Sequence, residues 1–118
     1  MEGFFETDLG RVHVHPSIVR EVIWPELVAT KTMLPANASH GNRDPESLRK
    51  HIDRTIAVQF EDGKVQATIA VQVEYGANIK AEAARLRERV VRALEAITGL
   101  EVGDLTINVE KVFPKAEA

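Results

Sequence analysis

Hydrophobic and polar residues alternate most regularly in two runs between Thr55 and Tyr75. Alternation of this kind is typical of strands with one buried face, and Asp62-Gly63 between the runs is a pair preferred in two-residue hairpin turns, where both positions need a positive φ. Counting outward from the turn predicts that Glu61 pairs with Lys64, Phe60 with Val65, Val58 with Ala67 and Ile56 with Ile69. Because this register pairs apolar with apolar residues, burial and turn chemistry predict the same hairpin.

The second run predicts a strand with one buried face and one face in water. Its apolar row continues through Val71, Val73 and Tyr75, whereas the opposite row holds Gln66, Thr68, Ala70, Gln72 and Glu74. On that wet face Ala57, Thr68 and Ala70 are small, so another flat protein surface could approach closely, and open sheet edges tend to pair with another chain. The alternative is a monomer whose polar face contacts only water.

After Gly76 the period of the pattern changes from two to between three and four. Apolar residues recur at Ile79, Ala83, Leu86, Val90, Leu94 and Ile97, which predicts an amphipathic helix. Asn78 can cap its first amides, and Gly99 suits the left-handed position that follows a last helical turn, with Leu100 folding back on Leu94. The helix therefore lies between a cap and a stop.

Shorter patterns complete the chain on both sides. Leu105, Ile107 and Val109 alternate with polar residues and predict a closing strand that extends to Phe113. Near the start, the alternation at 12–15 predicts a short strand, and Pro16 suits the first position of a following helix. Pro25 is expected to kink or end that helix, since proline cannot donate an interior hydrogen bond. Trp24 beside it is expected to pack on the core.

The middle of the chain, residues 31–54, has a different character. Between Lys31 and Arg43 turn-forming residues occur without a period, which predicts a mobile loop. Asp44, Pro45 and Glu46 then resemble the cap and first turn of a short helix that runs to about Asp53.

Together these elements predict an α+β fold in the order β-α-β-β-α-β, with the short helix before the hairpin. A two-layer arrangement, in which a mainly antiparallel sheet of three or four strands has two main helices on one face, buries every apolar row. Composition agrees: 118 residues suit a single domain (residues 1–118), and the apolar share of 44% is ordinary for a globular protein. A ferredoxin-like connection is one possibility, because strand order is not encoded in the pattern.

Charge and cysteine content exclude several function classes. The net charge of −3 provides no broad cationic field for nucleic acid or anionic lipid. The chain has no cysteine, so it holds no disulfide, thiolate nucleophile or thiolate metal site. Met1 to Gly10 is acidic and only locally apolar, unlike a signal peptide, and no segment has the length of apolar sequence that a membrane helix needs. We therefore expect a cytoplasmic protein that reaches the membrane only through a partner.

The stretch from Val71 to Val112 resembles the C-terminal half of the alkaline shock protein family, a bacterial group connected with cell-envelope stress. The resemblance is carried by four groups of residues: Val73 to Ile79 (VEYGANI), Val90-Val91 with Leu94, Thr98 to Val102 (TGLEV) and Ile107 to Val112 (INVEKV). Gly10 to Val14 and the helix after it resemble the family's opening strand and helix more weakly. Pro25 and the Leu34 to Arg54 insertion depart from the family pattern.

The resemblance implies a protein that is not an enzyme, needs no cofactor, and self-associates or docks on a membrane-anchored envelope protein. It supplies no catalytic residues. The residues that it shares with the family are structural: the turn glycine Gly76, the cap Asn78 and the helix stop Gly99, which join the Asp62-Gly63 turn.

Two alternatives to an interaction module can be named. His13 and His15 stand two apart on the predicted strand, so both rings could reach one metal ion, although zinc needs further ligands that the neighbouring sequence does not provide. Arg85, Arg89 and Arg92 form a stripe on the long helix that could bind an RNA backbone.

The metal-binding and RNA-binding alternatives each have a simpler structural interpretation. Glu82, Glu88 and Glu95 flank the arginine stripe at spacings that form ion pairs along a solvated helix. RNA-binding sheets also stack bases on aromatic side chains, which the wet face lacks. The serines at 17, 39 and 47 do not lie in the setting of a nucleophile with a nearby base and a strained turn, so a serine hydrolase is not expected. Protein contacts remain the expected function.

Overall fold

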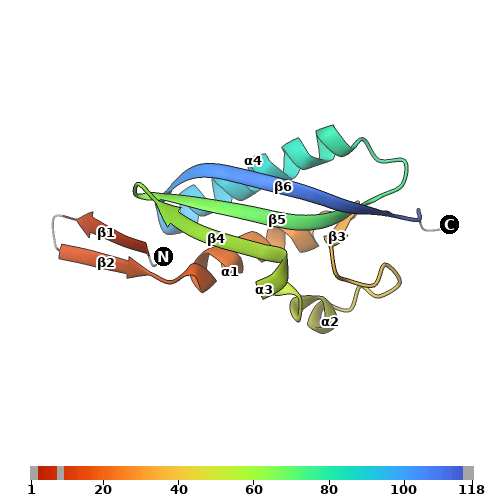
Figure 1. The fold of residues 1–118 in the computed structure, drawn as a ribbon, viewed down its shortest axis with the longest axis horizontal. Helices are drawn as coiled ribbons and strands as arrows, with labels where there is room; N and C mark the ends of the chain where they lie inside the picture. The colour runs from red at the N-terminus through yellow and green to blue at the C-terminus, as the bar shows by residue number, and fades with distance from the viewer. Residues whose placement is uncertain (1–2, 8–9, 116–118) are drawn as a thin grey trace.

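The computed structural model describes residues 3–7 and 10–115, which form one sheet layer and one helix layer (Figure 1). In chain order the elements are β1 (Gly3–Thr7), β2 (Gly10–Val14), α1 (Pro16–Val28), β3 (Met33–Pro35), α2 (Pro45–Arg49), α3 (Ile52–Thr55), β4 (Ile56–Glu61), β5 (Lys64–Glu74), α4 (Ile79–Thr98) and β6 (Glu101–Phe113). The two long helices α1 and α4 pack on the same face of the sheet, so the predicted α+β class is confirmed.

The central strand of the sheet is β5. Along one edge it pairs in parallel with β6 over almost its whole length, and along the other it pairs antiparallel first with β4 and then with β3. The sheet is therefore mixed, and it is three strands wide at any point. The parallel β5–β6 pair needs a crossover connection, which α4 provides.

The predicted hairpin is confirmed in every pair of its register, from Ile56 opposite Ile69 to Glu61 opposite Lys64. Asp62 and Gly63 have φ values of 54° and 74°, as the turn chemistry requires. The chain reverses here within two residues, which fixes which side chains of β4 and β5 face the helices.

The long helix α4 also has its predicted ends. Asn78 Oδ1 accepts a hydrogen bond from the Ala81 amide at 3.0 Å, and Gly99 ends the helix with a φ of 72°. Gly76 in the turn before the helix has a φ of 94°, a conformation that favours glycine. Leu100 packs against the core just beyond the stop.

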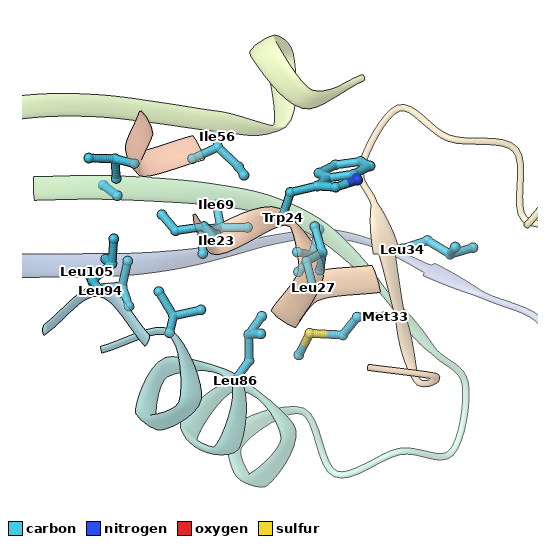
Figure 2. Packing of buried hydrophobic residues seen from close by; sticks show 14 of the residues in the cluster. Ile23, Trp24, Leu27, Met33, Leu34, Ile56, Ile69, Leu86, Leu94 and Leu105 are labelled. Carbon is cyan, nitrogen blue, oxygen red and sulfur yellow. The ribbon is translucent and has the colours of Figure 1, made fainter. Parts of the chain in front are cut away.

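The core lies between the sheet and the two helices, as Figure 2 shows from close by. Its largest fully buried side chains come from both layers: Val19, Ile23 and Leu27 of α1, Met33 of β3, Ile56 of β4, Val65, Ile69, Val71 and Val73 of β5, and Leu86 and Leu94 of α4. Leu34 of β3 is also fully buried, but it lies opposite Gln72 on the other face of the sheet. Trp24 is buried as predicted. One continuous cluster therefore holds the layers together.

Three positions predicted for the core lie outside it. Tyr75 follows the last residue of β5, in a turn where the Ala77 amide bonds to the Glu74 carbonyl, and its side chain is exposed. Ile79 and Ile97 occupy the first and last turns of α4 and are exposed as well. The hydrophobic periodicity predicts the buried face correctly along β5 and α4. The ends of both elements, however, extend beyond the layer that packs against them.

The strand predicted near Val12 and Val14 is present, but it lies outside the main sheet. This strand, β2, pairs with β1 in a separate antiparallel hairpin that projects from one end of the molecule (Figure 1). The projection explains why the radius of gyration is 15.1 Å, above the roughly 13.5 Å of a compact domain of this length. Residues 1 and 2 of the N-terminal segment lie outside the described residues.

The first helix does not end at Pro25, since α1 continues to Val28. Proline lacks one helical hydrogen bond, but Ile23 and Leu27 on either side of it are fully buried against the sheet. Packing on both sides of Pro25 holds the backbone helical, and the Ala29 amide bonds to the Pro25 carbonyl at 3.0 Å.

Replacing His15 tests how α1 begins. His15 Nδ1 accepts a hydrogen bond from the Ser17 amide at 3.1 Å, so the imidazole acts as the helix cap. Loss of a cap costs about 0.5–2 kcal/mol, so His15→Ala should lower the free energy of unfolding by that amount in a urea titration. His15→Asp should match or exceed wild type, because aspartate caps well and its charge suits a helix N-terminus. Equal stability of all three proteins would contradict this role.

Candidate functional site

The face of the sheet turned away from the helices is divided into a covered part and an open part. The covered part lies under the segment from β3 to Arg43, which the sequence predicted as a mobile loop. Leu34, Ala36 and Ala38 of this segment are buried, and the Ala36 amide bonds to the Ala70 carbonyl at 3.0 Å. The segment is therefore anchored to the sheet, which corrects that prediction.

Gln72 fastens this segment. Its side chain was expected on the wet face, yet it is only 4% exposed. Its Nε2 donates hydrogen bonds to the carbonyls of Pro35 at 3.0 Å and Ala38 at 2.7 Å. A primary amide supplies two N–H donors from one atom, and here both meet backbone oxygens of the covering segment. The Pro35 carbonyl also accepts a hydrogen bond from the Ala38 amide at 3.0 Å.

On the β6 side of the covered part, Phe113 and Arg43 lie against each other. Two bulges in β6 change its register against β5, so that Phe113 pairs with Glu74 and is buried. The Arg43 guanidinium lies 5.8 Å from the centre of the Phe113 ring and also donates to the Lys31 carbonyl at 2.8 Å. The insertion at 31–54 is thus an integral part of the fold.

The open part of the same face holds two of the three small residues named from the sequence. Ala57 and Thr68 are paired across β4 and β5, and both are exposed. Ala70 is half-buried beside the covering segment. The small side chains leave a shallow hollow of about 230 Å³ whose lining is mostly neutral: Ala57, Gln59, Gln66, Ala67, Thr68, Asp104 and Thr106.

The arginine stripe of α4 does not form a free cationic surface. Arg85 donates to Glu82 at 2.8 Å, and Arg92 pairs with Glu88 one turn away. Arg89 turns toward α1, where it donates to the Glu26 carbonyl at 3.0 Å and to the Thr30 hydroxyl. All three side chains are engaged within the protein. Arg85 and Arg92 pair with flanking glutamates, as predicted for a solvated helix face, whereas the contacts of Arg89 lie at the end of α1.

Removing Arg89 should therefore affect stability and not surface charge alone. Its guanidinium satisfies carbonyl and hydroxyl groups at the end of α1, and hydrogen bonds from a charged group contribute about 1.5–3 kcal/mol. We expect Arg89→Met to lower the free energy of unfolding by that amount in urea. Arg85→Met and Arg92→Met, which remove only exposed ion pairs, should change it by less than about 1 kcal/mol. Three equal effects would show that Arg89 is another surface arginine.

The two histidines do not form a metal site with neighbouring ligands. His15 lies beyond the end of β2, and its Nδ1 is used in capping α1. No group of three or more histidine, aspartate or glutamate side chains is placed to hold a metal ion among residues 3–7 and 10–115. The spacing of His13 and His15 suggested a shared metal site only because the predicted strand included His15. Strand β2 ends one residue earlier, at Val14.

One ion pair fixes the short helix α2 to α1. Arg49 donates to a carboxylate oxygen of Glu21. That hydrogen bond lowers the pKa of Glu21 and raises the pKa of Arg49. Both groups are exposed to solvent, so the pair orients α2 and stabilises the protein only slightly.

No helix of the described part is long and apolar enough to cross a membrane.

The similarity of the chain to known proteins lies at the level of the family. No curated protein and no solved structure matches the chain. One family model does match, over residues 5–114, which is nearly the whole chain and includes the insertion. By this match the chain belongs to the family of alkaline shock protein 23, which has a cell envelope-related function.

Proposed function

We propose that the protein acts in the cell envelope as a non-catalytic interaction module, and that it binds its partner through the open part of the sheet face. The observation that carries this proposal is the exposed, nearly uncharged hollow around Ala57 and Thr68. Small side chains let a partner backbone come close, and the surrounding amides and hydroxyls can pair with its polar groups. The cytoplasmic side of the membrane, reached through an envelope protein, is the expected location.

Two features of the described residues support binding to protein over the alternatives. The arginines that an RNA backbone would need are engaged in ion pairs and helix contacts. The hollow has a single carboxylate, Asp104, among its lining residues, so it offers neither a pair of acids for acid–base catalysis nor a ligand set for zinc. Its shape and neutrality fit a docking surface.

Host cells carrying single variants test this proposal. Thr68→Arg places a long charged side chain in the middle of the hollow without disturbing the core, since Thr68 is exposed. Cells with this variant should be as sensitive to envelope stress as cells that lack the protein. Ala84→Arg is the matched control, because Ala84 is also an exposed small residue and lies on α4. Wild-type resistance of the Thr68→Arg cells, with normal levels of folded protein, would exclude the open face as the functional surface.

A further inference from the structure

One charged side chain, that of Asp104, lines the hollow of the open face, and a bulge in β6 places it there. Between the pairs that Val65 and Ala67 make with β6, the register gains one residue, so Gly103 and Asp104 both stand opposite Gln66. Bulges of this kind re-aim a side chain. Here the carboxylate of Asp104 lies on the same face of the sheet as Gln66, and both side chains line the hollow.

The other residue of the bulge, Gly103, leaves room for the side chain of Gln66. A Cβ atom at Gly103 would lie 3.4 Å from Lys64 Cβ and 3.5 Å from Gln66 Cγ. Since glycine has no side chain, the Gln66 side chain lies against the backbone of the bulge. Its amide therefore joins the lining of the hollow beside the carboxylate of Asp104.

The polar side chains of the hollow are not used inside the protein. Within residues 3–7 and 10–115, none of the following side chains has a hydrogen bond or an ion pair: Gln59, Gln66, Thr68, Asp104 and Thr106. Farther along β6, by contrast, the side chains of Asn108 and Glu110 bond to each other at 3.2 Å. The hollow thus gathers a carboxylate, two amides and two hydroxyls whose hydrogen-bonding capacity remains open to a partner.

The face around the hollow carries more negative than positive charge. The strands β4, β5 and β6 place five carboxylates and two lysines on this face: Glu61, Glu74, Glu101, Asp104 and Glu110, against Lys64 and Lys111. The ammonium group of Lys64 already lies 3.6 Å from a carboxylate oxygen of Glu101. Arg43 of the covering segment lies over Phe113, at the other end of β6 from the hollow. The local charge therefore favours a cationic group at Asp104.

We propose that the hollow receives an arginine side chain of the partner protein, and that Asp104 pairs with its guanidinium. A guanidinium carries five N–H donors in one plane and no acceptor, and it matches a carboxylate with two parallel hydrogen bonds. The amide and hydroxyl oxygens around Asp104 are acceptors for its remaining donors. A guanidinium is also more weakly hydrated than the ammonium group of a lysine, which suits a half-enclosed hollow. This inference rests on the proposed function, because it names the group with which the partner occupies the open face.

Isosteric replacement of Asp104 tests the pairing. Asp104→Asn keeps the shape of the side chain and removes its charge. Its affinity for the envelope protein that wild type recovers from host cells, titrated in purified form in detergent, should be about tenfold lower, as expected when a hydrogen bond loses its charged member. Glu95→Gln is the matched control, because Glu95 is an exposed carboxylate on α4, and it should bind like wild type. Urea unfolding curves of both variants should coincide with wild type, since both side chains are exposed.

Reversing the charges on both sides identifies the arginine. Each arginine of the recovered envelope protein is replaced by glutamate in turn. One of these variants should lose binding to wild type and regain it with Asp104→Arg, which should not bind the unchanged partner. Such recovery in the double variant measures a direct interaction between the two side chains.

Two results would overturn the pairing and leave the open face as the partner surface. In the first, Thr68→Arg loses the envelope protein while Asp104→Asn binds it as tightly as wild type. In the second, no arginine of the partner gives recovery with Asp104→Arg. Binding that survives in Thr68→Arg is a different failure, because it removes the proposed function itself. Equal losses in Asp104→Asn and Glu95→Gln would show that overall surface charge governs binding and would also exclude the pairing.

Discussion

The Gln72→Glu variant is expected to be less stable than wild type by about 3–5 kcal/mol at neutral pH, the range seen when a buried charge loses its compensation. Gln72 donates to the carbonyls of Pro35 and Ala38 from a site that water does not reach. A carboxylate there accepts hydrogen bonds only, so it faces backbone oxygens that repel it. The covering segment should detach from the sheet or the whole domain should unfold.

This loss should depend on pH in one direction. Burial beside carbonyl oxygens raises the pKa of the introduced carboxyl above that of the same group in the unfolded chain. The folded variant then binds the proton more tightly, so its stability is highest in acid and falls as the pH rises through the ordinary range of a glutamate and beyond. A urea titration at several pH values measures the difference from wild type. Gln59→Glu on the exposed part of the same face is the control and should show little loss at any pH. An equal loss in both variants would mean that Gln72 is not a buried clamp.

The Leu86→Ala variant is expected to lose about 2–5 kcal/mol of unfolding free energy. Leu86 is fully buried where α4 packs on the sheet, and its removal leaves a cavity that surrounding side chains only partly fill. The same helix carries the control, because Ile97 is mostly exposed. Ile97→Ala should change stability by no more than about 0.5 kcal/mol. Thermal or urea unfolding of the two variants, measured at a protein concentration where both are monomeric, checks the contrast. A small effect at Leu86 would contradict the packing of α4 against the sheet.

The elements with local signals could be predicted in detail from the sequence. The hairpin register follows from alternation together with the Asp62-Gly63 turn, and the ends of α4 follow from Asn78 and Gly99. In each case the determining interaction joins residues close in the chain. The family resemblance rests on the same local features, and it is confirmed over a longer stretch than the segments that suggested it.

The features that the sequence could not predict depend on contacts between distant residues. Gln72 occupies a polar position in an alternating strand, and only the segment at 34–38, which lies far back in the chain, makes it a buried clamp. Phe113 is buried because bulges in β6 shift its register, which alternation does not encode. Strand β2 has the pattern of a sheet strand, but β1 beside it provides a nearer partner.

The residues of the candidate surfaces also divide into those that local patterns predict and those that depend on contacts between distant residues. Ala57 and Thr68 could be placed on the open face from register alone, whereas Ala70 required knowledge of the covering segment. Arg89 belonged to a stripe in the helical pattern, and its turn toward α1 follows from how the two helices pack. Exposure of Tyr75 and Ile97 arises at the ends of elements, where periodicity does not show how far the opposing layer extends.

The proposed function requires that the open sheet face bind a protein of the cell envelope. The most direct measurement recovers tagged wild type and tagged Thr68→Arg from detergent-solubilised host cells at low and high salt, and identifies what accompanies each. We predict that an envelope protein accompanies wild type at both salt concentrations and is absent with Thr68→Arg, while Ala84→Arg retains it. Recovery of RNA that dissociates as the salt concentration rises, with no envelope protein that depends on Thr68, would contradict this function.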